Sequence, residues 1–241
     1  MFSMPAARQS TPTDSTGDRL VVAIDGPSGS GKSTVARRVA QRLALRYLDT
    51  GAMFRAVTLR ALQARVDLED DESLLALAQR TTLDVTTDPC DFAVRVDGED
   101  ATAAISTRAV SNAVSAVSAS PGVRSWLLRL QRSIVGTGGI VVEGRDIGTV
   151  VVPDAQVKIF LTASSSERAT RRFQEIDEPA DDVEAGLRDT KAEIDRRDHL
   201  DSSRDAAPLL RAEDAVELDS TTMTADEVVN AVLARCPVPI K

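Results

Sequence analysis

A short apolar run followed by a glycine-rich turn constrains the fold of this chain more than any other feature. Residues 20–24 are Leu-Val-Val-Ala-Ile, an apolar run typical of a strand buried on both faces. The pattern G-x-x-x-x-G-K-[ST] follows at once, in Gly26, Pro27, Ser28, Gly29, Ser30, Gly31, Lys32, Ser33 and Thr34. Residues 32–46 then repeat apolar side chains at four-residue steps, which predicts an amphipathic helix. Because strand, loop and helix come in the order that the pattern requires, we predict a phosphate-binding loop.

Each residue type in this loop has a physical reason. Glycines permit the positive φ angles that turn successive backbone N–H groups toward a β-phosphate. The N-terminus of the helix adds a partial positive charge. Lys32 is expected to neutralise β- and γ-phosphate oxygens, and the Ser33 hydroxyl to ligate Mg²⁺. The loop therefore predicts an ATP site that works with Mg²⁺.

The remaining apolar pattern predicts how the chain is organised. Further core strands are expected at 47–48, 140–143, 157–161 and 215–218, and helices at 52–65, 165–176, 182–200 and 224–235. Strands that alternate with helices predict an α/β fold, a central parallel sheet flanked by crossover helices. We assign the core to residues 19–66 and 136–241.

The segment 67–135 differs from this core. Strands are expected at 81–87 and 92–96, with a hairpin turn at Asp97-Gly98, followed by helices at 106–119 and 122–135. We interpret it as an inserted subdomain. Residues 1–18 are rich in Ser, Thr and Pro and lack periodicity, which predicts a mobile tail.

Composition excludes several classes of function. With 29 basic and 37 acidic residues the net charge is −8, which argues against a general duplex-binding protein and weakly favours a monomer. No run approaches the roughly 20 apolar residues of a membrane span, and the first residues do not resemble a secretion signal. A single histidine and two unpatterned cysteines disfavour a zinc site or a catalytic triad. We expect a cytoplasmic protein that binds neither nucleic acid nor membranes.

Arginine placement favours a kinase among proteins with such loops. The Asn-Lys-x-Asp stretch with which GTPases read guanine is absent from the sequence. Arg168, Arg171 and Arg172 follow at i, i+3 and i+4, so one helix face presents three guanidinium groups. The alternative for any one of them is a solvated face paired with Glu175 and Asp177. Cations gathered over a transferring phosphoryl group are what a kinase requires.

Two polar loops are expected where core strands end, which is where doubly wound sheets bind ligands. Thr50 and Arg55 follow the strand at 47–48; Thr50 is equally well explained as a helix cap. Arg145 and Asp146 follow the strand at 140–143. Arg145 is suited to a bidentate grip on phosphate, and Asp146 to accepting a hydrogen bond from a base or ribose.

The ordered set DGPSGSGKST, LDTGAMFR, EGRDIGTVV, PDAQVKIFLTASSSERATRR, APLL and LDSTT resembles the bacterial cytidylate kinases, from about Leu20 to Leu233. The resemblance implies that the segment 67–135 is the domain that binds the nucleoside monophosphate, and that residues of about 164–180 form a lid over ATP. It further implies the following roles. Arg55, Arg145 and Arg204 grip the acceptor phosphate, Ser115, Arg124 and Asp146 read cytosine, and Arg197 and Asp201 touch the sugar, while Thr50 matches a small hydroxyl position. Arg168, Arg171 and Arg172 belong to the lid, with Lys32, Arg145, Arg168 and Arg172 acting on the moving phosphoryl and Arg171 on ATP.

The implied activity is transfer of the γ-phosphoryl of ATP to CMP or dCMP. The sequence departs from the family pattern at Glu143, where a shorter carboxylate is expected, at Ser33, where many members have Gly, and at His199-Leu200, where charged residues are common. Two alternatives remain open: a kinase for another small acceptor, and a regulatory module that hydrolyses ATP slowly.

Overall fold

A central parallel sheet organises the protein, whose computed structural model describes residues 19–175, 183–204 and 206–237. Its strands lie in the order β2-β6-β1-β7-β8. They are β1 (Val21–Asp25), β2 (Arg46–Asp49), β6 (Ile140–Gly144), β7 (Val157–Thr162) and β8 (Val216–Asp219). Every pairing is parallel, which confirms the predicted α/β fold. The predicted tail at 1–18 lies outside the described residues.

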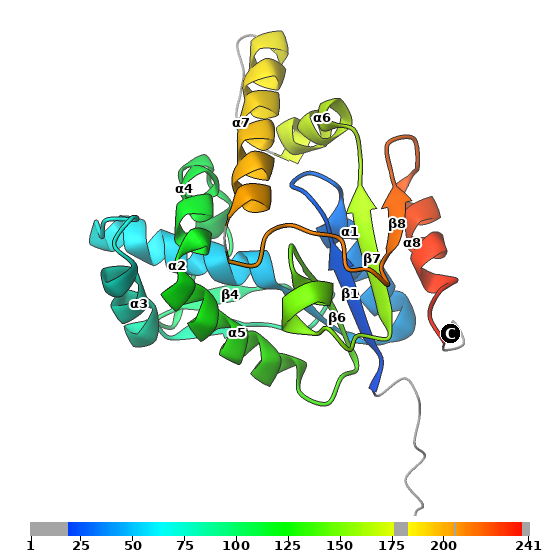
Figure 1. The fold of residues 1–241 in the computed structure, drawn as a ribbon, viewed down its shortest axis with the longest axis horizontal. Helices are drawn as coiled ribbons and strands as arrows, with labels where there is room; N and C mark the ends of the chain where they lie inside the picture. The colour runs from blue at the N-terminus through cyan, green and yellow to red at the C-terminus, as the bar shows by residue number, and fades with distance from the viewer. Residues whose placement is uncertain (1–18, 176–182, 205, 238–241) are drawn as a thin grey trace, which may run out of the picture.

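The central strand β1 is buried on both faces, as its apolar run predicts. Val22 and Ile24 pack in one cluster with α1 (Lys32–Leu43) and α8 (Ala225–Leu233). Val21 and Ala23 face the opposite way, toward α2 (Thr50–Ala64) and α5 (Pro121–Val135). Figure 1 shows α2 and α5 to the left of the sheet and α8 to its right. Because successive side chains of a strand point to opposite faces, one apolar run serves both layers.

Residues 67–135 contain a second, antiparallel sheet of order β3-β4-β5. Besides α5, the segment 67–135 contains α3 (Asp71–Arg80), β3 (Leu83–Val85), β4 (Val94–Val96), β5 (Glu99–Asp100), a short 3₁₀ turn (Ala104–Ser106) and α4 (Arg108–Ala119). The predicted hairpin is confirmed, with Asp97 and Gly98 both at positive φ between β4 and β5. Leu74 and Leu127 share one buried cluster with Ala23 of β1, so this segment packs onto the core of the sheet.

Helix α3 was not among the predicted elements. Its signals are local: the Asp70 carboxylate accepts from the Ser73 amide as an N-cap, and Leu74, Leu77 and Ala78 form its buried face. Five of its ten residues are apolar, in one continuous run at 74–78, and such a short run does not distinguish a helix from a strand. Packing against α5 supplies what this pattern lacks.

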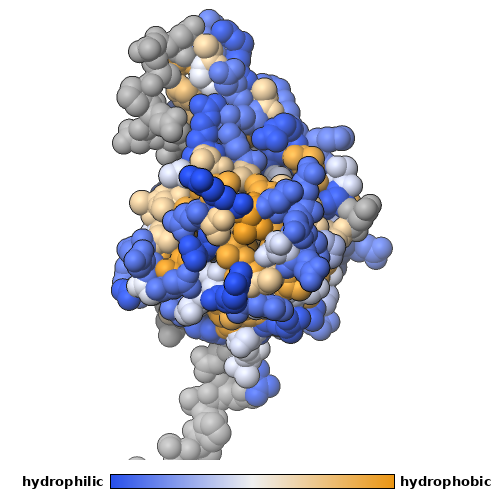
Figure 2. Space-filling model, turned by 90° about the vertical axis from the view of Figure 1, so that its left-hand side faces the viewer, coloured by the Kyte–Doolittle hydropathy of each residue, from blue (hydrophilic) through white to orange (hydrophobic). Residues whose placement is uncertain are grey.

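Helices α6 (Ser165–Glu175) and α7 (Val183–Ser203) stand above the sheet (Figure 1). Seen from the side in Figure 2, the projecting part carries mostly hydrophilic side chains, whereas hydrophobic ones gather on the body below. Helix α7 continues past the predicted end at residue 200, so Asp201 lies in its last turn rather than just beyond it. None of the described helices has the length and apolar character needed to span a membrane.

Candidate active site

The phosphate loop is held by close backbone packing. A Cβ on Gly26 would lie 2.0 Å from the carbonyl oxygen of Leu161, and one on Gly29 would lie 2.6 Å from that of Arg168. Both glycines have positive φ, at 150° and 73°. Side chains at these positions would push the loop off β7 and α6, so glycine is required by space as well as by conformation.

Lys32 lies folded back over the loop. Its Nζ donates to the carbonyl oxygen of Pro27 at 2.7 Å and to Ser30 Oγ at 3.4 Å. Burial, reinforced by the nearby Arg145 guanidinium, lowers the pKa of Lys32 to about 7. A bound polyphosphate would restore the charged form, because opposite charge favours the ammonium.

The Glu143 carboxylate connects three elements beside Lys32. It is buried, and it accepts from the hydroxyl of Tyr47 and, at 3.1 Å, from Ser33 Oγ. Burial, and then the neighbouring Asp49 carboxylate, raise the pKa of Glu143 to about 7. Glu143, which departs from the family pattern, therefore positions the Ser33 hydroxyl, the group that is expected to bind a metal ion.

Thr50 is not the cap of α2. That role belongs to Asp49, whose Oδ1 accepts from the Ala52 amide at 2.9 Å. The Thr50 hydroxyl instead donates to the backbone oxygen of Glu143 at 2.7 Å. The same Asp49 carboxylate binds Arg55 at 2.9 Å, which fixes that guanidinium at the cavity wall.

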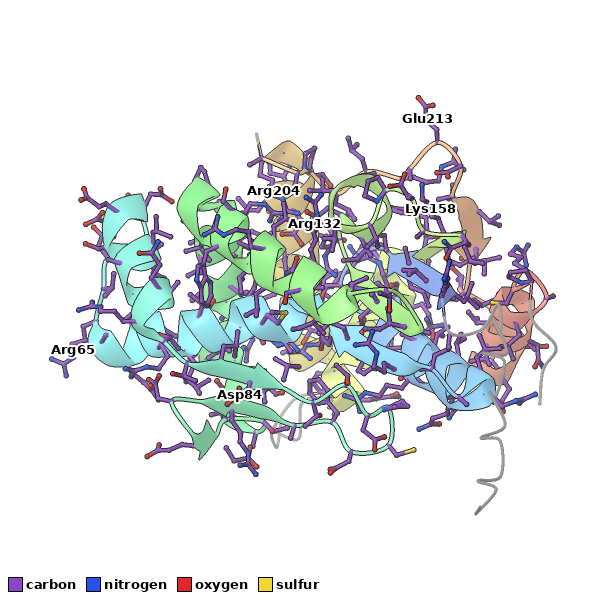
Figure 3. All side chains as sticks on the ribbon, turned by 90° about the horizontal axis from the view of Figure 1, so that it is seen from below. Arg65, Asp84, Arg132, Lys158, Arg204 and Glu213 are labelled. Carbon is purple, nitrogen blue, oxygen red and sulfur yellow. The ribbon has the colours of Figure 1, made fainter. Side chains whose placement is uncertain are left out.

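A cavity of about 190 Å³ opens where β1, β2 and β6 end, and it collects most of the predicted site residues. From the loop it takes Ser28, Gly29, Gly31, Lys32, Ser33 and Thr34. From the predicted acceptor set it takes Thr50, Arg55, Arg124, Arg145, Asp146, Arg197, Asp201 and Arg204. In Figure 3 Arg204 lies toward the middle of the molecule, beside the end of α7, whereas Arg65 lies at its outer edge. Tertiary packing thus brings together segments that are far apart in the sequence.

Positive charge exceeds negative charge in this cavity. The Asp201 carboxylate lies 3.0 Å from Arg145 Nε, 3.9 Å from Arg197 Nε and 3.7 Å from Arg204 Nη1. Burial opposes ionisation of Asp201, but Arg145 and its neighbours outweigh it and hold the pKa of Asp201 below its usual value. Burial lowers the pKa of Arg197 to about 9. Nε of Arg197 and Nη2 of Arg204 are buried and make no hydrogen bond to any described residue, so donors remain for an anion.

A second group of residues closes the cavity on the side of α5. Arg124 donates to the Asp146 carboxylate through Nη2 and to the Ser118 carbonyl oxygen at 3.0 Å through Nη1. Its guanidinium carbon lies 5.3 Å from the centroid of the Phe54 ring. These residues combine a fixed charge pair with an apolar ring, which suits a flat polar ligand such as a nucleobase.

The three arginines of the predicted lid lie on one helix, α6, but their side chains contact different parts of the structure. Arg168 donates to the Ser28 carbonyl oxygen at 3.0 Å and to the Asp198 carboxylate, outside the cavity lining. Arg171 donates to Ser220 Oγ at 2.9 Å. Only Arg172 lines the main cavity.

A second cavity of about 390 Å³ lies on the other side of the phosphate loop. It is lined by Ser30, Gly31, Thr34, Val35, Glu167, Arg171, Gln174, Ser220, Met223, Ala225 and Val228. Gly31 and Thr34 line both cavities. Two ligands bound in these cavities would therefore meet at the loop.

The main cavity is lined by residues that were not predicted, and Ser115, which was predicted, lies outside its lining. Ser115 does not line the main cavity; it lines a neighbouring one of about 30 Å³. On the same helix, Ser111 and Ser118 line the main cavity instead. Their spacing of seven residues, two helical turns, was a signal in the sequence. Phe54, which falls within the predicted helix 52–65, lines the cavity too.

Comparison with known proteins decides the family. The cytidylate kinase family profile matches residues 22–237. This chain belongs to the cytidylate kinase family. A cytidylate kinase of Geobacillus kaustophilus (strain HTA426) is 48% identical over 215 residues, covering 89% of this chain and 95% of that protein. One of Nocardia farcinica (strain IFM 10152) is 51% identical over 214 residues, covering 88% and 90%. A solved shikimate kinase from Acinetobacter baumannii covers 90% of this chain and 92% of its own at 14% identity and a TM-score of 0.41, too distant to carry an argument.

Two oxygen ligands beside the phosphate loop of this cytidylate kinase family member suit a metal ion that a bound nucleotide would also coordinate. Within residues 19–175, 183–204 and 206–237 no three Asp, Glu, His or Cys side chains gather as a metal site. The Ser33 hydroxyl and the Glu143 carboxylate are oxygen donors that lie together. Mg²⁺ takes few protein ligands and completes its shell with phosphate oxygens and water, so these residues fit it.

Proposed function

We propose that this protein transfers the γ-phosphoryl group of ATP to CMP or dCMP, giving ADP and CDP or dCDP, with Mg²⁺ as cofactor. The observation that carries the proposal is that two cavities meet at the phosphate loop and that the main cavity, the smaller of the two, is lined by an excess of guanidinium groups. Membership of the cytidylate kinase family supports the choice of acceptor.

We assign ATP to the phosphate loop and to the cavity beside Arg171. The loop amides and Lys32 would bind its β- and γ-phosphates. Ser220, which accepts from Arg171, fixes that guanidinium at the wall of the cavity. Mg²⁺, held by Ser33 beside Glu143, would supply positive charge to the phosphate oxygens.

We assign the acceptor to the main cavity. Arg55, Arg145 and Arg204 would bind its phosphate, and Arg197 with Asp201 would bind its sugar. Arg124, Asp146 and the ring of Phe54 would enclose its base. Ser115 stays a proposed base contact through the resemblance alone, since it lines the adjoining cavity.

Catalysis then consists of positioning and charge stabilisation. Lys32, Arg145 and Arg172 line the cavity in which the transferring phosphoryl would lie. Arg168 would act from the rim, through its grip on the Ser28 carbonyl oxygen. Phosphoryl transfer has a transition state with charge spread over its equatorial oxygens, so surrounding cations lower the barrier. A phosphate acceptor needs no general base, because its oxygen is already ionised near neutral pH.

Discrimination against uracil would come from the Asp146 carboxylate. The cytosine amino group is a donor that this carboxylate can accept from, whereas uracil presents a carbonyl oxygen there. A site built for a donor rejects an analogue that lacks it, because its own buried acceptor is left unpaired.

The test is a coupled assay of ADP release with ATP and each of CMP, dCMP, UMP, AMP and GMP. Turnover with CMP and dCMP well above the other acceptors supports the proposal. A preference for UMP, AMP or GMP would make the protein a kinase for another acceptor. Slow ADP release that no acceptor stimulates would indicate a regulatory ATP-binding module.

A further inference from the structure

A buried carboxylate, Asp25, lines none of the cavities described above. It is the last residue of β1, and the phosphate loop begins at the next residue, Gly26. Its two oxygens accept from the amides of Ile147 and Gly148, each at 2.8 Å. A carboxylate is suited to this, because its two oxygens can serve two successive N–H groups.

The amides that Asp25 binds open a π-helical turn, Ile147–Val151. The first N–H groups of a helical turn have no partner within the turn and need an external acceptor. The residue before this turn, Asp146, provides no side-chain cap. Asp25, more than a hundred residues earlier in the chain, therefore supplies the cap from the neighbouring strand.

Arg145 and Asp146 lie directly between the end of β6 and this turn. The backbone oxygen of Asp146 accepts from Val150 at 2.9 Å and from Val151 at 3.1 Å, so the position of Asp146 is tied to that of the turn. The strands before the loop and before the turn, β1 and β6, are each hydrogen-bonded on both sides, but the two hydrogen bonds of the Asp25 carboxylate reach the turn and not the loop. Loss of the Asp25 carboxylate would consequently loosen the acceptor side more than the ATP side.

Resting on the proposed function, we infer that Asp25 is a positioning residue that holds Arg145 and Asp146 in the geometry required to bind the acceptor nucleotide. It acts through the backbone of the π-helical turn and does not touch either substrate. Its ionised form is the effective one, since a protonated carboxyl keeps only one full acceptor for the two amides.

The charged groups around Asp25 are consistent with this role. Burial raises the pKa of Asp25 to about 6, helped by Asp146 and opposed by its two amide hydrogen bonds and by Lys32. Lys158, beside Gly148, is paired with Asp214 at 2.7 Å. Arg132 binds the far end of the turn, at the Val150 and Val151 carbonyl oxygens. Asp25 is thus ionised at neutral pH and loses its charge in mildly acidic solution.

The first test compares Asp25→Asn with Ile24→Val in the full chain. Asp25→Asn keeps the shape but offers one acceptor, and we expect the KM for CMP to rise about tenfold while the KM for ATP stays within about twofold. Ile24→Val shortens a fully buried neighbour in β1 and should lower the Tm with both KM values unchanged. Equal changes of both KM values in Asp25→Asn, or no change, would overturn the inference.

The second readout is the pH dependence of inhibition by cytidine 5′-sulfate, whose sulfate ester does not titrate between about pH 5 and 8, unlike the CMP phosphate. In the wild type its Ki should rise about tenfold as the pH falls from 7 to 5, and in Asp25→Asn this step should be absent. Parallel profiles would contradict the inference.

Should Asp25→Asn not fold, Asp25→Thr suits a buried strand, keeps one acceptor and serves the same measurements. If the wild type prefers another acceptor, the comparison is made with that acceptor and its sulfate analogue. A failure of the proposed function can then be distinguished from a failure of the inference about Asp25.

Discussion

The Nε of Arg145 lies 3.0 Å from the Asp201 carboxylate, which joins the loop after β6 to the last turn of α7. Arg197 and Arg204 approach the same carboxylate from α7 and from the residue after it. Asp201 is therefore the shared counter-ion of three arginines. An anionic acceptor would take over part of this role, because it brings its own negative charge to the same guanidinium groups.

Substitutions of Asp201 and of Arg204 should have different effects on the kinetics with CMP and dCMP. If Asp201 also accepts from a sugar hydroxyl, Asp201→Ala should raise the KM for CMP by a factor that corresponds to a loss of about 1.5–3 kcal/mol of binding free energy. It should also alter the ratio of kcat/KM for CMP to kcat/KM for dCMP. Arg204→Ala should reduce kcat/KM for both substrates by a larger factor without altering the ratio, since both carry the same phosphate. Measurement of kcat/KM for CMP and dCMP in both variants checks this. Near-wild-type values in both would place the acceptor elsewhere.

Lys32→Ala should abolish transfer while the fold persists. The Lys32 ammonium donates hydrogen bonds to two loop atoms, Pro27 O and Ser30 Oγ, and Lys32 does not belong to the apolar cluster beside α1, so its loss leaves that cluster intact. We expect kcat to fall about a thousandfold or more, as for the loss of a major transition-state charge. Single-turnover rates and the melting temperature measure the two effects separately. Turnover near the wild-type level would mean that ATP does not bind this loop.

The pKa of Lys32 predicts a pH dependence with a definite sign. A lysine with a pKa of about 7 is charged below that pH and neutral above it, so kcat/KM for ATP should fall as the pH rises through 7. The value of kcat should change less, because bound phosphates raise the pKa of Lys32. Lys32→Arg, which stays charged throughout, is the control and should show no such decline in kcat/KM. A decline of the same size in Lys32→Arg would assign it to another group.

Arg124 and Asp146 should govern the choice of base. Asp146→Asn removes the negative charge and replaces one of the two accepting oxygens by an NH₂ group that cannot accept from the cytosine amino group, and Arg124→Ala releases Asp146 from its partner. Either change should lower kcat/KM for CMP by about tenfold to a hundredfold and that for UMP much less. Side-by-side assays with CMP and UMP decide the matter. Proportional losses for both acceptors would show that the two residues support the phosphate site or the fold.

The phosphate loop and the sheet around it could be predicted because their signals are local. Residues 20–34 contain the buried strand, the glycines and Lys32 in one continuous stretch, and backbone conformation acts over a few residues. Helix α7 and β1 were placed to within a few residues for the same reason. Helix α3 was missed because its stability depends on packing against α5, which a short window of sequence does not reveal.

The sequence by itself determined the strand-loop-helix unit, the alternation that builds a parallel sheet, and the identity of the candidate site residues. Only the tertiary structure decided which partners those residues have. Arg168 and Arg172, four residues apart on α6, contact Asp198 and Ser111 because different elements pack against that helix. Asp25 reaches Ile147, 122 residues away, because β1 and β6 are neighbours in the sheet. Side-chain identity is a local property of the chain, but hydrogen-bond partners and burial depend on which segments the fold brings together.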